Sequence, residues 1–306
     1  MKEVKVTEEK LEEYKDLAKD NPTGFKVIVN EFKKDKLAIV SLVVLAVLWI
    51  GIFVGAMLLD KEQVMKVDIL NSYVRPGEAG HILGTDQGGR DLFGQLIIGA
   101  RNSIVIGIAV TILTSVIGIV VGLFIGYYGG WLDNIIMRII DFIQILPTMM
   151  IIIVFVTIVP KYSMFTFVLI FTVFYWTGMA RLVRSKALAE SKKDYVNASK
   201  TMGTSDLKTM FTGILPNISS ILIVDMTLSF AGNIGIETGL SFLGFGLPPS
   251  DPSLGTLVSL ARKPEVIQDK LYVWLPASLL ILVMMLCINY IGQALRRASD
   301  AKQRKG

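Results

Sequence analysis

Residues 193–206 read Lys193-Asp-Tyr-Val-Asn-Ala-Ser-Lys-Thr-Met-Gly-Thr-Ser-Asp206, and the chain continues to Ile214-Leu-Pro216 between two long apolar runs. Residues 194–202 favour a helix, and Gly203 suits the left-handed conformation in which helices often end. The following Thr204-Ser-Asp206 suits the cap of a second helix that runs to Phe211. The pattern predicts two short helices in a polar segment that precedes an apolar run opened by Pro216.

The apolar runs around this segment are long enough to cross a membrane. Hydrophobic residues make up 52% of the 306 residues, and the runs exceed the ~18 residues that a spanning helix needs. We therefore expect an all-α, polytopic membrane protein with six transmembrane helices. The predicted spans are residues 37–59, 103–127, 139–159, 163–182, 218–245 and 273–295.

The distribution of positive charge predicts the orientation. With the N-terminus inside, 22 of the 31 Lys and Arg residues fall in inside segments and nine fall outside. Cytoplasmic flanks retain Lys and Arg, so we expect a multi-pass membrane protein with both termini cytoplasmic. The basic residues are dispersed among acidic ones, so the net charge of +5 does not indicate a nucleic-acid partner.

This topology divides the chain into five parts. Residues 1–36 are expected to form cytoplasmic and interfacial helices, with 37–59 as the first transmembrane helix and 60–102 as an extracellular loop. Residues 103–295 form the transmembrane core, which includes a cytoplasmic loop at 183–217, and 296–306 form a cytoplasmic tail. Lys33, Lys34 and Lys36 either contact anionic membrane lipid or are ordinary cytoplasmic flanking charges.

Two features within the spans concern helix packing and polar groups. Gly118, Gly122 and Gly126 repeat every fourth residue, which predicts a face for close helix packing.

Asp225, Asn233 and Glu237 place polar groups in or near the fifth span, where charge is costly unless it faces water or a partner. They are candidates for a translocation path or gate, although Glu237 is also consistent with a position at the outside surface of the membrane, where exposure to water costs little.

The segment quoted first resembles a signature of the inner-membrane permeases of ATP-binding cassette importers. That signature reads Glu-Ala-Ala, three residues, Gly, nine residues, then Ile, one residue, Leu-Pro. The chain matches at Ala198, Gly203 and Leu215-Pro216, and it departs at Asn197, Ser199 and Gly213.

Three further stretches resemble the C-type permeases of oligopeptide and dipeptide importers. They are His81-Ile-Leu-Gly-Thr-Asp-Gln-Gly-Gly-Arg-Asp-Leu92, Gly126-Tyr-Tyr-Gly-Gly-Trp-Leu-Asp133 and Glu237-Thr-Gly-Leu-Ser-Phe-Leu-Gly-Phe-Gly-Leu-Pro-Pro249. The resemblance covers about residues 32–297.

The resemblance implies a type I ABC importer permease fold in the bacterial cytoplasmic (cell) membrane, and a set of partners. Those are a homologous sister permease, two ABC ATPase subunits that bind ATP and Mg²⁺, and an extracellular or periplasmic peptide-binding protein. It also implies that the loop docks on an ATPase subunit and moves the spans by alternating access. The residues expected at this docking loop are Asp194, Tyr195, Val196, Ala198, Ser199, Met202, Gly203, Thr204, Ser205 and Asp206.

The sequence does not predict catalytic or nucleotide-binding activity for this chain. No Gly-Lys dipeptide occurs, so a phosphate-cradling Gly-x-x-x-x-Gly-Lys loop is excluded. His81 is the only histidine and Cys287 the only cysteine, so we expect no catalytic residue, metal site or cofactor in this chain.

Two alternatives to peptide import stay open on the sequence. One is an importer of nickel or another small solute with the same architecture, because that family shares the permease motifs. The other is an ion-gradient-driven carrier, which would more typically show inverted repeats with interrupted helices.

Overall fold

Helices α5 (Leu92–Tyr128) and α8 (Met164–Glu190) pack closely along the predicted row of glycines. A Cβ atom added to Gly118, Gly122 or Gly126 would lie 2.6–2.7 Å from an atom of α8. A carbon atom cannot approach that closely, so these three positions require glycine for the two backbones to meet. The predicted packing face is confirmed.

The computed structural model describes residues 32–159, 162–248 and 250–305, with side chains to residue 299. Predictions for residues 1–31 lie outside the described residues. In the described part, helices are joined by loops that contain an isolated β-bridge between Thr85 and Asp91. The all-α prediction is therefore confirmed.

Five helices of the described part are long and apolar enough to cross a membrane. They are α3 (Lys36–Leu58), α5, α8, a continuous helix from Asp206 to Leu243, and α14 (Leu271–Lys305). A sixth crossing is formed if α6 (Gly130–Ile145) and α7 (Thr148–Ile158) count as one broken span, because these two helices meet at an angle of 80°.

The third span differs from the expectation of one run over 139–159. Leu146 is extended, with φ −68° and ψ 141°, and Pro147 follows it. A proline disfavours helical geometry in the residue before it, so the helix stops and restarts in a new direction. The expected segment is therefore not one uninterrupted helix, although α6 and α7 together can still form one broken span.

The polar loop also differs in part. Its first predicted helix is α9 (Asp194–Thr201), and Gly203 adopts φ +78°, as expected for a helix end. The second does not exist as a separate element. Instead α10 (Asp206–Lys208), a π-helical stretch η2 (Thr209–Ile214) and α11 (Leu215–Leu243) follow one another without a break. Pro216 lies inside this continuous helix, directly after the π-helical stretch, where the regular i→i−4 hydrogen bonding is already altered.

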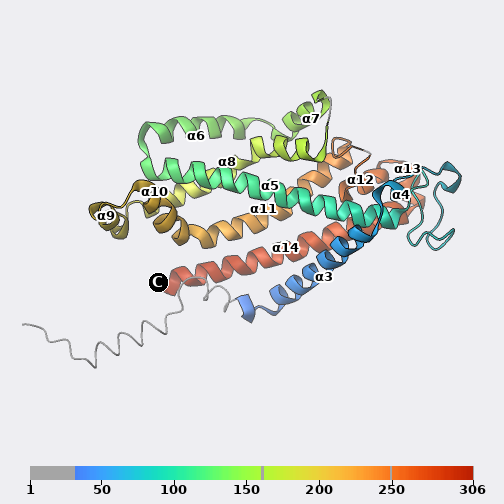
Figure 1. Ribbon diagram of the computed structural model, residues 1–306, viewed down its shortest axis with the longest axis horizontal. Coiled ribbons are helices and arrows are strands. Elements are labelled where there is room, and N and C mark those ends of the chain that lie inside the picture. Colours follow the sequence, from blue (N-terminus) through green and yellow to red (C-terminus); the bar gives the residue numbers. More distant parts are fainter. Residues whose placement is uncertain (1–31, 160–161, 249, 306) are drawn as a thin grey trace, which may run out of the picture.

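The long helices run between two ends of the molecule (Figure 1). The "α9 end" carries α9, α10, the start of α3 and the C-terminus. The "α12 end" carries α4 (Lys61–Val64), α12 (Leu254–Ser259) and α13 (Pro264–Asp269), together with the 3₁₀ turns η1 (Ile69–Asn71) and η3 (Leu260–Arg262). Of the spanning helices, α5 packs on α8 and α11, α11 packs on α14, and α14 packs on α3.

The loop before α5 is ordered against the α12 end. Tyr272 donates a hydrogen bond to the carbonyl of Tyr73 at 3.0 Å, and Lys61 forms an ion pair with Asp251. Asp91 caps α5 by accepting a hydrogen bond from the Gly94 amide at 2.7 Å, so this helix begins eleven residues before the predicted span at 103.

Candidate functional site

Val196 anchors α9 to the spanning helices. Its side chain is fully buried in an apolar cluster at the α9 end. The cluster includes Leu123 and Tyr127 of α5, Val183 and Ala187 of α8, and Met210 and Ile214 of η2. This one side chain of α9 therefore lies in a socket, the "Val196 socket", built from three separate elements.

Polar contacts fix α9 in the same position. Tyr195 donates to a carboxylate oxygen of Glu190 at 2.8 Å, and Lys193 pairs with the other oxygen at 2.6 Å. Burial raises the pKa of Tyr195, so its phenol stays a neutral donor at physiological pH. At the other end of α9, Ser199 lies 3.3 Å from the Thr209 hydroxyl, and Tyr127 donates to Asp206 at 2.6 Å.

Several apolar side chains of the polar loop at this end are exposed. Met202 is 78% exposed, Leu207 55%, Phe211 39% and Tyr195 37%. Neighbouring lysines of the same loop, Lys192, Lys200 and Lys208, are exposed as well. Such a patch on a polar loop is typical of a protein contact surface.

The predicted docking residues divide by exposure. Asp194, Tyr195, Ala198, Met202, Gly203 and Ser205 are exposed, Ser199, Thr204 and Asp206 are half-buried, and Val196 is buried. Sequence reasoning missed Leu207 and Phe211. Their spacing of four places them on one face of a helix, and that signal was available.

The candidate path residue Glu237 lies in a different environment, at the α12 end. Its carboxyl group is fully buried and accepts hydrogen bonds from three serine hydroxyls: Ser253 at 2.7 Å, Ser241 at 2.8 Å and Ser103 at 3.0 Å. Ser103 also accepts from the Leu254 amide at 3.1 Å. This "Glu237 cluster" joins α5, α11 and the start of α12.

Asn233 and Asp225 complete the polar positions of α11. Asn233 is buried, and its side-chain amide donates to the Thr111 hydroxyl of α5 at 2.9 Å. Asp225 is half-buried. Asn233 and Glu237, four residues apart on α11, bond different neighbours: Asn233 bonds Thr111, and Glu237 bonds the three serines. Among the described residues, no group of three or more His, Cys, Asp or Glu side chains could hold a metal ion.

Comparison with known proteins gives consistent matches along the chain. Residues 118–305 match the family described as binding-protein-dependent transport system inner membrane component. The oligopeptide transport system permease protein OppC of Lactococcus lactis subsp. cremoris (strain SK11) is 49% identical over 276 residues, which cover 90% of this chain and 94% of that protein. The protein of the same name from Bacillus subtilis (strain 168) is 34% identical over 94% of this chain and 93% of its own length.

The matched region contains α8, α9, α11 and α14, and thus both the Val196 socket and most of the Glu237 cluster. With relatives this similar over nine tenths of its length, the chain belongs to the family of binding-protein-dependent transport system inner membrane components.

Proposed function

We propose that the chain is the permease subunit of an ATP-driven importer of oligopeptides. As a family member it is one subunit of a multi-subunit ABC transporter, and it is not an enzyme. Peptide as the substrate is supported by its relatives, which are oligopeptide transport permeases at 49% and 34% identity. Neither nickel import nor gradient-driven transport has comparable support.

The observation that carries the mechanism is the contrast between the two faces of α9. One face inserts the fully buried Val196 among three elements of the membrane domain, while Met202 beyond it is 78% exposed. A helix anchored on one side and open on the other passes a push from a bound subunit into the spans. The open patch of Met202, Leu207 and Phe211 is then the surface on which an ATPase subunit docks.

The proposed cycle uses this contact. ATP and Mg²⁺ bind on two separate ATPase subunits, whose closure moves α9 through the docked patch. The Val196 socket transmits that movement to α5, α8 and η2, and the spans exchange between inward-open and outward-open states with a homologous sister permease. A peptide-binding protein delivers peptide at the α12 end.

The polar residues of α11 take different roles in this proposal. Asp225, which is half-buried, lines the translocation path. Asn233 and Glu237 belong to the gate, because they hold α11 against α5 and α12. The α9 end faces the cytoplasm, as the excess of Lys and Arg in segments at that end supports.

The test is a pair of charge substitutions in the docking patch of the tagged, full-length chain in its native membrane. Met202→Asp combined with Leu207→Asp should abolish co-purification of ATPase subunits and ATP-dependent uptake of a labelled peptide. The matched control is Leu70→Asp, a 96% exposed residue in the loop at the α12 end.

The control variant should retain the ATPase subunits, and both variants should insert into the membrane at parental levels. Parental co-purification and uptake in the patch variant would show that docking occurs elsewhere. Uptake of nickel instead of peptide by the parental complex would show that the proposed substrate is wrong and that the chain belongs to a nickel importer.

A further inference from the structure

A cavity of about 250 Å³ lies at the α12 end, and Arg90 is part of its wall. The lining of this "Arg90 cavity" comes from segments far apart in the chain, namely the loop before α5, the end of α11 with the connection into α12, and η3. Ser241, which donates a hydrogen bond to Glu237, also lines it. A ligand in the cavity would therefore contact a member of the Glu237 cluster.

The charged groups that line the Arg90 cavity, among the described residues, are the two arginines Arg90 and Arg262 and the carboxylate of Asp86. One oxygen of Asp86 accepts hydrogen bonds from the Gly88 amide at 2.7 Å and from the Arg90 amide at 3.0 Å. The other oxygen accepts from the side chain of Gln95 at 3.1 Å. Asp86 is thus held by backbone and amide donors, and its hydrogen bond with Arg90 does not use the guanidinium group.

Neither guanidinium group has an acidic partner in the part of the chain that the structure describes. Nε of Arg90 is buried and has no hydrogen-bond partner there. Arg262 donates from Nε to the carbonyl of Ser259 at 3.3 Å, which is a neutral acceptor. A guanidinium is charged at physiological pH and carries only donors, and a buried donor without an acceptor is unfavourable. The cavity therefore favours an anionic acceptor.

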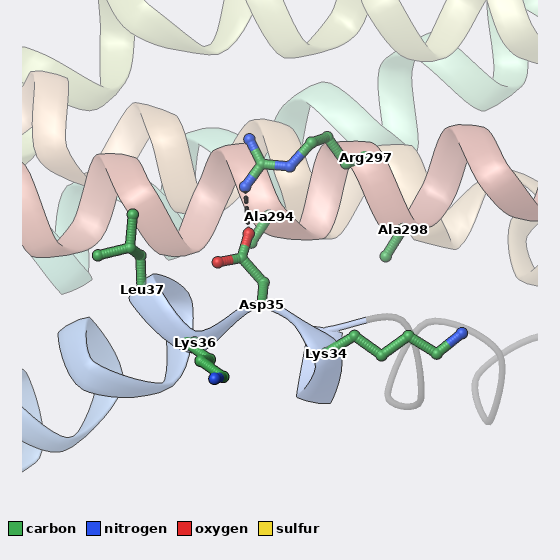
Figure 2. Close-up of a pocket in the computed structure, with 7 residues that line it drawn as sticks. All are labelled: Lys34, Asp35, Lys36, Leu37, Ala294, Arg297 and Ala298. Carbon is green, nitrogen blue, oxygen red and sulfur yellow. Dashed lines mark hydrogen bonds and ion pairs between the residues drawn. The ribbon is translucent and has the colours of Figure 1, made fainter.

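A cavity at the α9 end, of about 480 Å³ between α3 and α14, shows the contrasting case of an arginine that is already paired (Figure 2). Its arginine, Arg297, forms an ion pair with Asp35 across the two helices. Asp35 also caps α3 by accepting from the Ala38 amide at 3.2 Å. Arg297 thus joins two helices, whereas the described residues give Arg90 and Arg262 no such ion pair.

The volume of the Arg90 cavity indicates a ligand larger than a single anionic group. At about 30 Å³ for each water molecule, the cavity has room for roughly eight waters. A carboxylate group alone would fill a small part of this space, whereas a whole amino-acid residue fills most of it. A neighbouring cavity of about 480 Å³ shares Arg90 and Met65 with the first and offers room for further residues of an extended chain.

We propose that the Arg90 cavity binds the carboxyl-terminal residue of the transported peptide, with the terminal carboxylate held by Arg90 and Arg262. This inference rests on the proposed function, in which peptide arrives at the α12 end. A terminal carboxylate is ionised at neutral pH, and arginine binds carboxylates through paired, charge-assisted hydrogen bonds. The bound residue lies against Ser241, beside the Glu237 cluster. The permease itself then selects peptides that have a free carboxyl terminus.

Binding of an alanine pentapeptide with a fluorescent label on its amino terminus tests the proposal. The probe is titrated by fluorescence anisotropy into the purified transport complex without its binding protein, and the same peptide with a carboxyl-terminal amide is the second probe. The parental complex should bind the free acid about tenfold or more tightly than the amide. Arg90→Gln combined with Arg262→Gln should weaken binding of the free acid to the level of the amide and leave binding of the amide unchanged.

The matched control removes two positive charges from the α12 end outside the cavity. Lys66→Gln combined with Arg75→Gln, both exposed residues that do not line it, should retain the preference for the free acid. Arg90→Lys combined with Arg262→Lys should keep part of the preference, because the charge stays and the paired geometry is lost. Arg262→Gln alone, at an exposed position, should also reduce the preference, and it replaces the double variant if that variant does not fold.

Three outcomes would overturn the site. One is equal binding of acid and amide by a parental complex that takes up peptide with its binding protein and ATP, and in that case the proposed function stands. Another is a cavity variant that discriminates the two peptides as the parental complex does but has lost affinity for the binding protein, because the arginines would then hold an acidic side chain of that protein. A parental complex that takes up no peptide would overturn the proposed function and this inference together.

Discussion

At the α12 end, α5 and α11 are joined through a buried carboxyl group, whereas at the α9 end α5, α8 and the helix leading into α11 are joined through an apolar side chain. The Glu237 cluster uses three directional hydrogen bonds, and each requires its partner at a fixed distance and angle. The Val196 socket uses non-directional contact with apolar side chains. The first kind of contact favours a single geometry, and the second tolerates small shifts of the packed helices, which is what the proposed docking of a moving partner on α9 requires.

The largest effect is expected at the Glu237 cluster. Glu237→Ala leaves three buried serine hydroxyls without their acceptor and should destabilise the folded protein by about 3–5 kcal/mol. Thermal unfolding of the purified chain in detergent measures the loss. Thr238→Val is the control, because the Thr238 hydroxyl is buried without a partner; its removal should not destabilise the protein and should raise its stability slightly, since an unsatisfied buried hydroxyl is itself unfavourable. Equal losses for the two variants would contradict a specific role of the carboxyl group.

A smaller effect is expected at the Val196 socket. Val196→Ala removes two methyl groups from a fully buried position and should cost about 2 kcal/mol. In the reconstituted complex, the ATP hydrolysed per peptide transported should rise, because movement of α9 is passed on less completely. Met202→Ala, at a 78% exposed position, should leave the unfolding midpoint unchanged. Unaltered coupling in Val196→Ala would show that force enters the spans by another contact.

The smallest effect is expected at the exposed ion pair between Asp35 and Arg297, which joins α3 to α14. The pKa of Asp35 is lowered below its ordinary value of 3.8, so the contribution of the carboxylate is present above the unfolded-state pKa and is lost as the pH falls through the folded-state pKa. Asp35→Asn should give a small decrease in the unfolding midpoint that is constant from about pH 5 to 7 and disappears in stronger acid. In an Arg297→Gln background the same substitution should have no further effect, and a persistent decrease there would contradict the pairing.

The sequence was sufficient for the all-α class, the position of most spans and the glycine face on α5, because these depend on local pattern. It predicted the ends of helices less well where two local signals disagreed. Pro147 marks the break between α6 and α7. The apolar run continues across this proline, and the prediction of one continuous span followed the run instead of the proline. Conversely, Thr204-Ser-Asp206 was interpreted as the start of a short helix, but neither Gly213 nor Pro216 ends that helix, which continues into α11 through the π-helical stretch.

The site was less predictable than the fold because its contacts link distant parts of the chain. Glu237 meets Ser103, which is 134 residues earlier, and no local pattern indicates that pairing. Val196 was recognised as an apolar residue in a polar loop. Its direction, into the socket rather than out to a partner, depends on Leu123 and Val183, which belong to other helices.

The unbroken helix from Asp206 to Leu243 has a mechanical consequence. Its 38 residues give a rod about 57 Å long at 1.5 Å per residue. The exposed Leu207 lies at one end and Glu237 near the other. Such a rod acts as a lever arm: a tilt of about 5° at the end bearing Leu207 displaces Glu237, which lies about 45 Å along the rod, by about 4 Å. That displacement exceeds the length of any hydrogen bond in the Glu237 cluster, so a slight angular change is enough to break it.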